Sequence, residues 1–194
     1  MAIVLASTSP YRRELMHRLR LPFEVTAPTV DEARLPGEPP LALALRLAEA
    51  KATDVARQRS DAVVIGSDQV AELDGEPIGK PHTHAAALAQ LERMQGRRLV
   101  FHTALAVVAH GRVEVDSIPT AVTFRRLGRN ALEAYLRADQ PYDCAGAAKI
   151  ESLGIALVER VESDDPTALI GLPLIRLTSM LQAAGVIVLG GAAR

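Results

Sequence analysis

The feature that most constrains the fold is Ala62-Val63-Val64-Ile65-Gly66, a run without a polar side chain. A short apolar run of this kind, rich in β-branched residues, predicts a strand that is buried on both of its faces. Such a strand needs a packed layer on each side, so we expect a sheet that is covered by helices. The run is followed by Ser67-Asp68-Gln69, where we expect the strand to end.

The rest of the chain alternates between strand-like and helix-like patterns. Strands are expected at residues 3–5, 23–26, 62–66, 70–73, 99–109, 112–124 and 154–161, with hairpin turns at Asp74-Gly75 and His110-Gly111. Helices are expected at residues 10–19, 41–58, 83–94, 130–138 and 172–184. Because no repeat, low-complexity tract or linker divides the sequence, we predict one α/β domain over residues 1–194, built on a mixed sheet with flanking helices.

Neither sign of charge dominates, since 22 lysine and arginine residues nearly cancel 23 aspartate and glutamate residues. This balance argues against nucleic acid or a membrane surface as a partner. Cys144 is the only cysteine, so it forms no internal disulfide, which suits a reducing compartment. With neither a secretory signal nor an apolar run of about 18 residues, we expect a soluble protein of the cytoplasm.

A second informative stretch is residues 7–13, which follow a short apolar run at residues 3–5 near the N-terminus. Residues 7–9 offer three hydroxyl groups and Pro10 a fixed φ, which is the usual chemistry of a helix start. Arg12 and Arg13 then fall in the first turn, at the positive end of the helix dipole, where carboxylates would be stabilising. They either point into water beside an ordinary N-cap or help the free N–H groups to hold an anion. On this stretch alone the two interpretations are equally good.

Charged residues also occur at the ends of other predicted elements and within loops. Asp68 follows the apolar strand, in the crevice where open α/β sheets bind ligands, although a cap for the next turn is its simpler interpretation. Phosphoryl chemistry needs cations to neutralise oxygens, carboxylates to hold Mg²⁺ and a base to orient water. Each residue could also be an ordinary solvated charge, but together they supply that mixture: Arg12, Arg13, Lys51, Lys80, Glu32 and Asp68.

Several common sites are excluded by their spacing. No G-x-x-x-x-G-K-[ST] loop and no G-x-G-x-x-G turn occurs in the sequence. The five histidines and the one cysteine fall into no zinc-ligand pattern. Cys144 is more simply a small buried filler than a nucleophile.

Taken together, the motifs resemble the Maf family of nucleoside triphosphate pyrophosphatases over almost the whole chain. They are, in order, Leu5-Ala6-Ser7-Thr8-Ser9-Pro10-Tyr11-Arg12-Arg13, Val30-Asp31-Glu32, Ala48-Glu49-Ala50-Lys51-Ala52, Ile65-Gly66-Ser67-Asp68-Gln69-Val70, Gly79-Lys80-Pro81, Cys144-Ala145-Gly146 and Gly171-Leu172-Pro173-Leu174. The resemblance implies hydrolysis of a nucleoside triphosphate to the monophosphate and pyrophosphate, with a divalent cation, Mg²⁺ or Mn²⁺. It also implies a fold like that of inosine triphosphate pyrophosphatases, with two lobes around a central groove, and is compatible with a homodimer.

The resemblance further implies roles for individual residues. The proton acceptor falls on Asp68, and the metal-side acid falls on Glu32, with Asp68 as a second candidate metal ligand. The phosphate-binding positions fall on Ser7, Arg12, Arg13, Lys51 and Lys80.

Three more positions resemble the subgroup of this family that acts on 7-methyl-GTP, and these specificity positions are Tyr11, Gln69 and Glu151. Tyr11 replaces a tryptophan that is often seen there, and Ala148 stands where a bulkier residue is usual. The expected function is therefore the removal of a modified guanine nucleotide. The alternatives are a pyrophosphatase for dTTP, UTP or other nucleotides, and a nucleotide-responsive binding protein that affects cell division.

Overall fold

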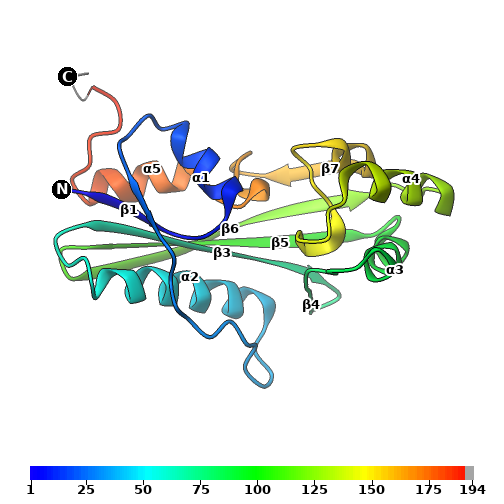
Figure 1. Ribbon diagram of the computed structural model, residues 1–194, viewed down its shortest axis with the longest axis horizontal. Helices are drawn as coiled ribbons and strands as arrows, with labels where there is room; N and C mark the ends of the chain where they lie inside the picture. Colours follow the sequence, from blue (N-terminus) through cyan, green and yellow to red (C-terminus); the bar gives the residue numbers. More distant parts are fainter. Residues whose placement is uncertain (191–194) are drawn as a thin grey trace.

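The computed structural model describes residues 1–190 as a mixed sheet of seven strands with helices on both faces (Figure 1). The strands are β1 (Ile3–Ala6), β2 (Glu24–Thr26), β3 (Val63–Leu73), β4 (Glu76–Ile78), β5 (Arg98–Ala109), β6 (Arg112–Phe124) and β7 (Val158–Ser163). They lie in the order β2-β1-β3-β5-β6-β7, and β4 pairs with one end of β3. β1 is parallel to β2 and β3, whereas the other pairs are antiparallel. The predicted α/β class with a mixed sheet is confirmed.

The helices form layers on the two faces of this sheet. α2 (Pro40–Ala56) covers one face, and α1 (Pro10–His17) and α5 (Leu174–Ala183) cover the other (Figure 1). α3 (His84–Met94) and α4 (Arg129–Asp139) pack at the far end of the long strands. The described part of the chain also forms three short 3₁₀ helices, η1 (Ala145–Ala147), η2 (Leu153–Leu157) and η3 (Ala168–Ile170). No helix within residues 1–190 has both the length and the apolar character that crossing a membrane requires.

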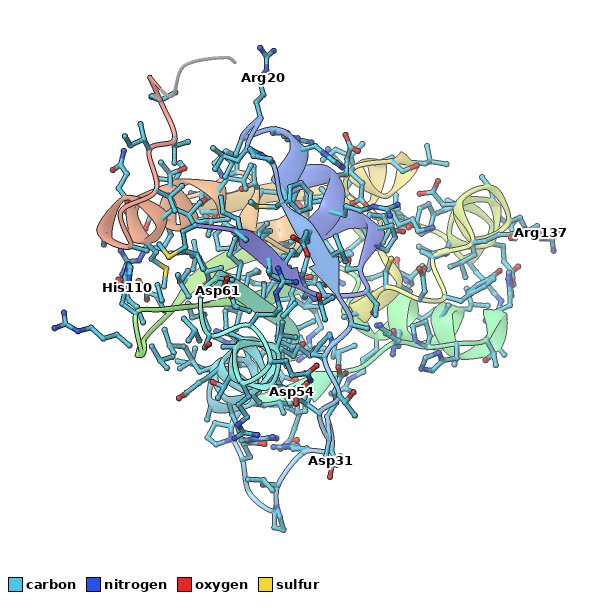
Figure 2. The ribbon with its side chains drawn as sticks, turned by 60° about the vertical axis from the view of Figure 1, so that its left-hand side comes forward. Arg20, Asp31, Asp54, Asp61, His110 and Arg137 are labelled. Carbon is cyan, nitrogen blue, oxygen red and sulfur yellow. The ribbon has the colours of Figure 1, made fainter. Side chains whose placement is uncertain are left out.

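The buried apolar side chains of residues 1–190 form three clusters, which divide this part of the chain into two lobes. Two clusters lie on opposite faces of β1, β3 and β5, one under α2 and the other under α1 and α5. The third cluster holds the ends of β3, β5 and β6 against α3 and α4. Figure 2 shows this division, with Arg137 of α4 well away from Asp54 of α2. Because β3, β5 and β6 run through both lobes, a single sheet joins them.

β3 corrects the expectation of two strands separated by Ser67-Asp68-Gln69, because it is one strand of 11 residues. Its polar side chains have partners in the folded protein. Ser67 donates to the backbone carbonyls of Ala104 and Gly171 at 2.8 and 3.1 Å, and Asp68 accepts from Lys51. Asp68 therefore lies in the middle of a strand and not after its end.

The predicted strand at residues 154–161 is also wrong in its first half, which forms η2. An added Cβ at Gly154 would lie 2.3 Å from the carbonyl oxygen of Lys149, so the backbone folds back tightly there. The N–H of Gly154 also donates to Asp139 of α4 at 3.2 Å. The other predicted helices and strands, apart from the two that merge into β3, are found with ends that differ by at most two residues.

A notch interrupts the sheet along one edge of β3. β1 pairs with β3 as far as Gly66, and β4 pairs with it again from Ala71, so neither strand pairs with residues 67–70. β1 runs parallel to β3 and β4 runs antiparallel to it, so both chains head into this gap. Ser7, which follows β1, and Lys80, which follows β4, therefore approach the gap from its two sides.

Glu38 anchors the loop that precedes α2 and carries Glu32. Arg46 of α2 donates to both carboxylate oxygens of Glu38, at 2.6 and 2.8 Å, and the N–H of Leu35 donates to it at 3.0 Å. The hydrogen bonds from Arg46 lower the pKa of Glu38 to about 2. The ion pair of Arg46 with Glu38 therefore holds the loop against α2 wherever the carboxylate of Glu38 is charged.

Gly66→Ala should lower the free energy of unfolding by about 1–3 kcal/mol, because overpacking a tight contact displaces its neighbours. An added Cβ would lie 2.3 Å from the carbonyl oxygen of Ala48 and 2.7 Å from the N atom of Ala52, both in the backbone of α2. Gly79→Ala is the control, since its added Cβ meets nothing within 4 Å. Urea titration compares the two variants. Equal stability would contradict the close approach of α2 to β3.

Candidate active site

The notch opens into a cavity of about 390 Å³ between the two lobes. Its walls come from the start of α1, from α2 and β3, from the segment after β4, and from the segments around η1 and η3. All the residues singled out from the sequence except Arg13 line this cavity: Ser7, Tyr11, Arg12, Glu32, Lys51, Asp68, Gln69, Lys80 and Glu151. Arg13 is exposed and lies outside the lining, so the structure separates it from its neighbour Arg12.

Lys51 joins the two acids on the α2 side of the cavity. Its Nζ atom lies 2.7 Å from Oδ1 of Asp68 and 2.8 Å from Oε1 of Glu32. The Lys51 and Asp68 residues are only 6% and 8% exposed, so their charges depend on each other for stabilisation. Glu32 is exposed at the mouth. One lysine thus holds a buried and an exposed carboxylate side by side.

Hydrogen bonds, burial and charges around the cavity shift the pKa values of Glu32 and Arg12. The hydrogen bond from Lys51 lowers the pKa of Glu32, and the charges of Lys51, Lys80 and Arg12 lower it further. Burial lowers the pKa of Arg12, while the nearby Asp68 and Glu32 oppose that change. Because arginine loses its proton only in strongly basic solution, Arg12 remains a cation at neutral pH.

The first turn of α1 provides polar groups at the notch. Ser9 caps the helix by accepting from the N–H of Arg12 at 3.4 Å, and the N–H of Ser9 donates to the hydroxyl of Ser7 at 3.1 Å. The Nε atom of Arg12 donates to the carbonyl of Gly171 at 2.9 Å. This bond fixes the side chain and uses only Nε. The two terminal NH₂ groups are left available, and such groups are suited to binding phosphate oxygens. The predicted helix start is confirmed, and its N-terminus faces the cavity.

Alternation along β3 sends neighbouring side chains to opposite faces of the sheet. Asp68 points toward α2 and Lys51, whereas Gln69 points toward η3 on the other face. Its Nε2 atom donates to the hydroxyl of Thr103 at 2.9 Å and to the carbonyls of Ala168 and Leu169 at 3.0 and 3.1 Å. The cavity therefore has a charged part on the α2 side and a second part on the η3 side.

The second part combines an aromatic ring with apolar and acidic groups. Tyr11 is half-buried at the wall, and burial together with the nearby Cys144 and Asp143 raises the pKa of its phenol, which stays neutral. Burial and Asp143 also raise the pKa of the Cys144 thiol to about 12, so it lacks the thiolate that a nucleophile needs. Glu151 is exposed at the rim. Cys144 lines the cavity without being activated.

The sequence did not single out three residues that shape the site. Phe101 of β5 lines the cavity, Thr103 of the same strand contacts Gln69, and the carbonyl of Gly171 holds Arg12. Gly171 stands in the motif Gly171-Leu172-Pro173-Leu174, so the sequence carried a signal, but the contact that Gly171 makes depends on a backbone atom. Phe101 and Thr103 lie within an ordinary buried strand pattern that carried no sign of function.

Glu32 and Asp68 are the groups suited to a divalent cation. Within residues 1–190 no cluster of three or more His, Cys, Asp or Glu side chains is arranged to hold a metal ion. Mg²⁺, however, is commonly bound by one or two carboxylates together with substrate phosphates and water. Two carboxylates that converge on Lys51 beside Arg12 and Lys80 fit that pattern.

Comparison with known proteins gives long matches. The family described as Maf-like protein matches residues 2–184. A 7-methyl-GTP pyrophosphatase of Albidiferax ferrireducens is 58% identical over 190 residues, which are 97% of this chain and 96% of that relative. Proteins of the same name from Polaromonas sp. and Thiobacillus denitrificans are 61% and 60% identical over 186 and 189 residues. These matches cover 95% and 96% of this chain, and 85% and 94% of the relatives.

Lys51→Met should raise the pKa of Glu32, because the hydrogen bond from Lys51 is the main influence that lowers it. In the wild type, the stability that this pair contributes is present at neutral pH and is lost as the pH falls through the folded-state pKa. The same variant leaves Asp68 buried without its partner, so its free energy of unfolding should fall by about 3–5 kcal/mol.

Carboxyl NMR titration measures the pKa, and urea titration the stability. Lys80→Met is the matched control, because Lys80 acts on Glu32 only through its charge and should shift the pKa less. A larger shift in the control would show that the contact between Lys51 and Glu32 is not the dominant one.

Proposed function

The chain belongs to the family of Maf-like proteins, and on this basis we propose that it is a nucleoside triphosphate pyrophosphatase that hydrolyses 7-methyl-GTP. The products are 7-methyl-GMP and pyrophosphate. The observation that carries the proposal is the bridge from Lys51 to Asp68 and Glu32, in a cavity that Arg12 and Lys80 also line. It brings carboxylates and cations to one place, which is the mixture that phosphoryl transfer requires.

The reaction begins with a water molecule that Asp68 orients toward the α-phosphorus. Lys51 occupies Oδ1 of Asp68, and no hydrogen bond within residues 1–190 uses Oδ2, so that oxygen is the one available to accept the proton. The water oxygen forms the new bond to the α-phosphorus, and the bond from this phosphorus to the bridging oxygen of the β-phosphate breaks. Asp68 takes the proton, and pyrophosphate leaves.

The cations stabilise the negative charge that this step develops. Arg12 offers its terminal NH₂ groups, while Lys80 and the hydroxyl of Ser7 approach from the two sides of the notch. A divalent cation held by Glu32 and Asp68 would neutralise phosphate oxygens and orient the chain of phosphates. Arg13 keeps its proposed role in phosphate binding only if the triphosphate reaches beyond the cavity lining.

The part of the cavity near η3 suits the base. Methylation at N7 gives guanine a formal positive charge, and an aromatic face attracts such a ring by about 0.5–2 kcal/mol. Tyr11 supplies that face, and the carboxylate of Glu151 accepts a hydrogen bond from the N1–H at the edge of the base. Hydrolysis of dTTP, UTP or other nucleotides, or nucleotide-responsive binding without turnover, are the competing functions. A panel of triphosphates with Mg²⁺, assayed for pyrophosphate, separates them.

The proposal places this activity in the cytoplasm, where a reducing environment suits the free Cys144. It includes Mg²⁺ or Mn²⁺ as cofactor and a second copy of the chain as a partner in a homodimer. It includes neither nucleic acid nor a membrane as partner.

Asp68→Asn should reduce kcat by about 10²–10⁴ while retaining the fold and most of the nucleotide affinity, because the amide keeps the size but loses the proton acceptor. The measurement is kcat across a titration with Mg²⁺ and Mn²⁺. Asp61→Asn is the control, because Asp61 lies on the exposed turn before β3 (Figure 2). Recovery at high metal concentration would assign Asp68 to metal binding. Activity within a few-fold of wild type would transfer the role of base to Glu32.

Tyr11→Ala should weaken the preference for 7-methyl-GTP over GTP by about 2- to 30-fold in kcat/KM, which corresponds to the loss of a cation–π contact. Tyr11→Phe keeps the ring and should keep the preference. Both variants are assayed with both nucleotides. Equal losses on the two substrates would show that Tyr11 contributes to packing alone.

A further inference from the structure

The orientation of the Gln69 amide is determined by its partners. Its Nε2 atom faces three oxygens, the hydroxyl of Thr103 and the carbonyls of Ala168 and Leu169, at 2.9, 3.0 and 3.1 Å. The carbonyls only accept, and the Thr103 hydroxyl already donates its hydrogen to the carbonyl of Ala168 at 2.9 Å. All three oxygens therefore present lone pairs to Gln69. Rotating the amide by half a turn would place Oε1 against them, so only one orientation is stable.

The same arrangement determines what Gln69 presents to the cavity. Gln69 is half-buried and lines the cavity, and no hydrogen bond within residues 1–190 uses its Oε1 atom. Within residues 1–190, the fully buried side-chain atoms that lack a hydrogen-bond partner are Oε1 of Gln90 and Oγ of Ser117. Oε1 of Gln69 is not among them, so it is not fully buried. It therefore keeps access to the cavity. The side chain faces a ligand as a hydrogen-bond acceptor only.

Thr103 is placed to impose this orientation. It lies directly opposite Gln69 in the pairing of β3 with β5, and it is fully buried. Its hydroxyl holds the Ala168 carbonyl and accepts from Gln69, so it connects the η3 segment to the amide. The Ala168 carbonyl also accepts from the N–H of Gly171 at 2.9 Å. Removing the hydroxyl would thus loosen Gln69 without leaving that carbonyl unsatisfied.

We propose that Thr103 is a positioning residue for base selection. Thr103 fixes the amide of Gln69 so that the Oε1 atom of Gln69 accepts a hydrogen bond from the 2-amino group of a guanine base. This inference rests on the proposed function. A guanine edge presents two neighbouring donors, N1–H and the 2-amino group, and the same cavity offers two acceptors, Gln69 and Glu151. The positive charge of a 7-methylated ring makes N1–H a more acidic donor than the 2-amino group, and a carboxylate such as that of Glu151 is a stronger acceptor than an amide oxygen. The 2-amino group is then left for Gln69.

The test compares 7-methyl-GTP with 7-methyl-ITP, which lacks only the 2-amino group. For the wild type we expect kcat/KM to favour 7-methyl-GTP by about five-fold, as the loss of one neutral hydrogen bond predicts. Gln69→Met keeps the length of the side chain without the acceptor and should remove this preference. Thr103→Val keeps the shape without the hydroxyl and should reduce it, by raising KM for 7-methyl-GTP while kcat stays near wild type. Thr103→Ser restores the hydroxyl and should restore the preference.

The outcomes separate the inference from the proposed function. If Gln69→Met retains the preference, or if Thr103→Val lowers activity equally on both nucleotides, Thr103 is a structural residue and the inference is overturned. If the wild type hydrolyses neither nucleotide, the proposed function fails, and the same comparison is made from dissociation constants by calorimetry. A preference in binding that depends on Thr103 would then support the inference alone. Equal binding of the two nucleotides would overturn it.

Discussion

The bridge from Lys51 to Asp68 and Glu32 is the interaction on which the rest of the site depends. Removing a charge from water costs several kcal/mol, and a partner at hydrogen-bond distance is needed to offset that cost. Lys51 meets the requirement only because α2 lies almost in backbone contact with β3. Gly66 permits that approach, since any side chain there would collide with Ala48 and Ala52 of the helix. The packing of one helix on one strand therefore sets the geometry of the charges.

The strand β3 organises the two parts of the cavity through its simple alternation. Asp68 faces α2 and the charged group, and Gln69 faces η3 and the part proposed for the base. Both side chains line the cavity because the notch between β1 and β4 leaves this edge of the strand without a neighbour. A rigid central strand places them more precisely than loops would, since its pairing with β5 continues through both positions.

The sequence predicted those parts of the fold that follow from local patterns. The apolar run at residues 62–66, the helical stripe of α2 and the hairpin turns at Asp74-Gly75 and His110-Gly111 are all found, because burial and turn chemistry are written in adjacent residues. The continuity of β3 was missed because Ser67, Asp68 and Gln69 are polar, and polar residues ordinarily end a buried strand. Their partners come from residues distant in sequence, which no local pattern reveals. Likewise, only the phase of α1 decides that Arg12 enters the cavity and Arg13 does not.

The segment around η3 connects the two parts of the cavity in a way that the sequence hardly suggests. Asp165 is buried and accepts from Thr167 and from the N–H of Ile175, which fixes the segment against the start of α5. Backbone carbonyls of this segment contact both parts of the cavity. The carbonyl of Gly171 accepts from Arg12, and the carbonyls of residues 168 and 169 accept from Gln69. Because backbone atoms of one segment hold both side chains, the groups proposed for the phosphates and for the base are held at a fixed separation. In the proposed complex, a nucleotide whose phosphates lie in one part is thereby aligned with the other.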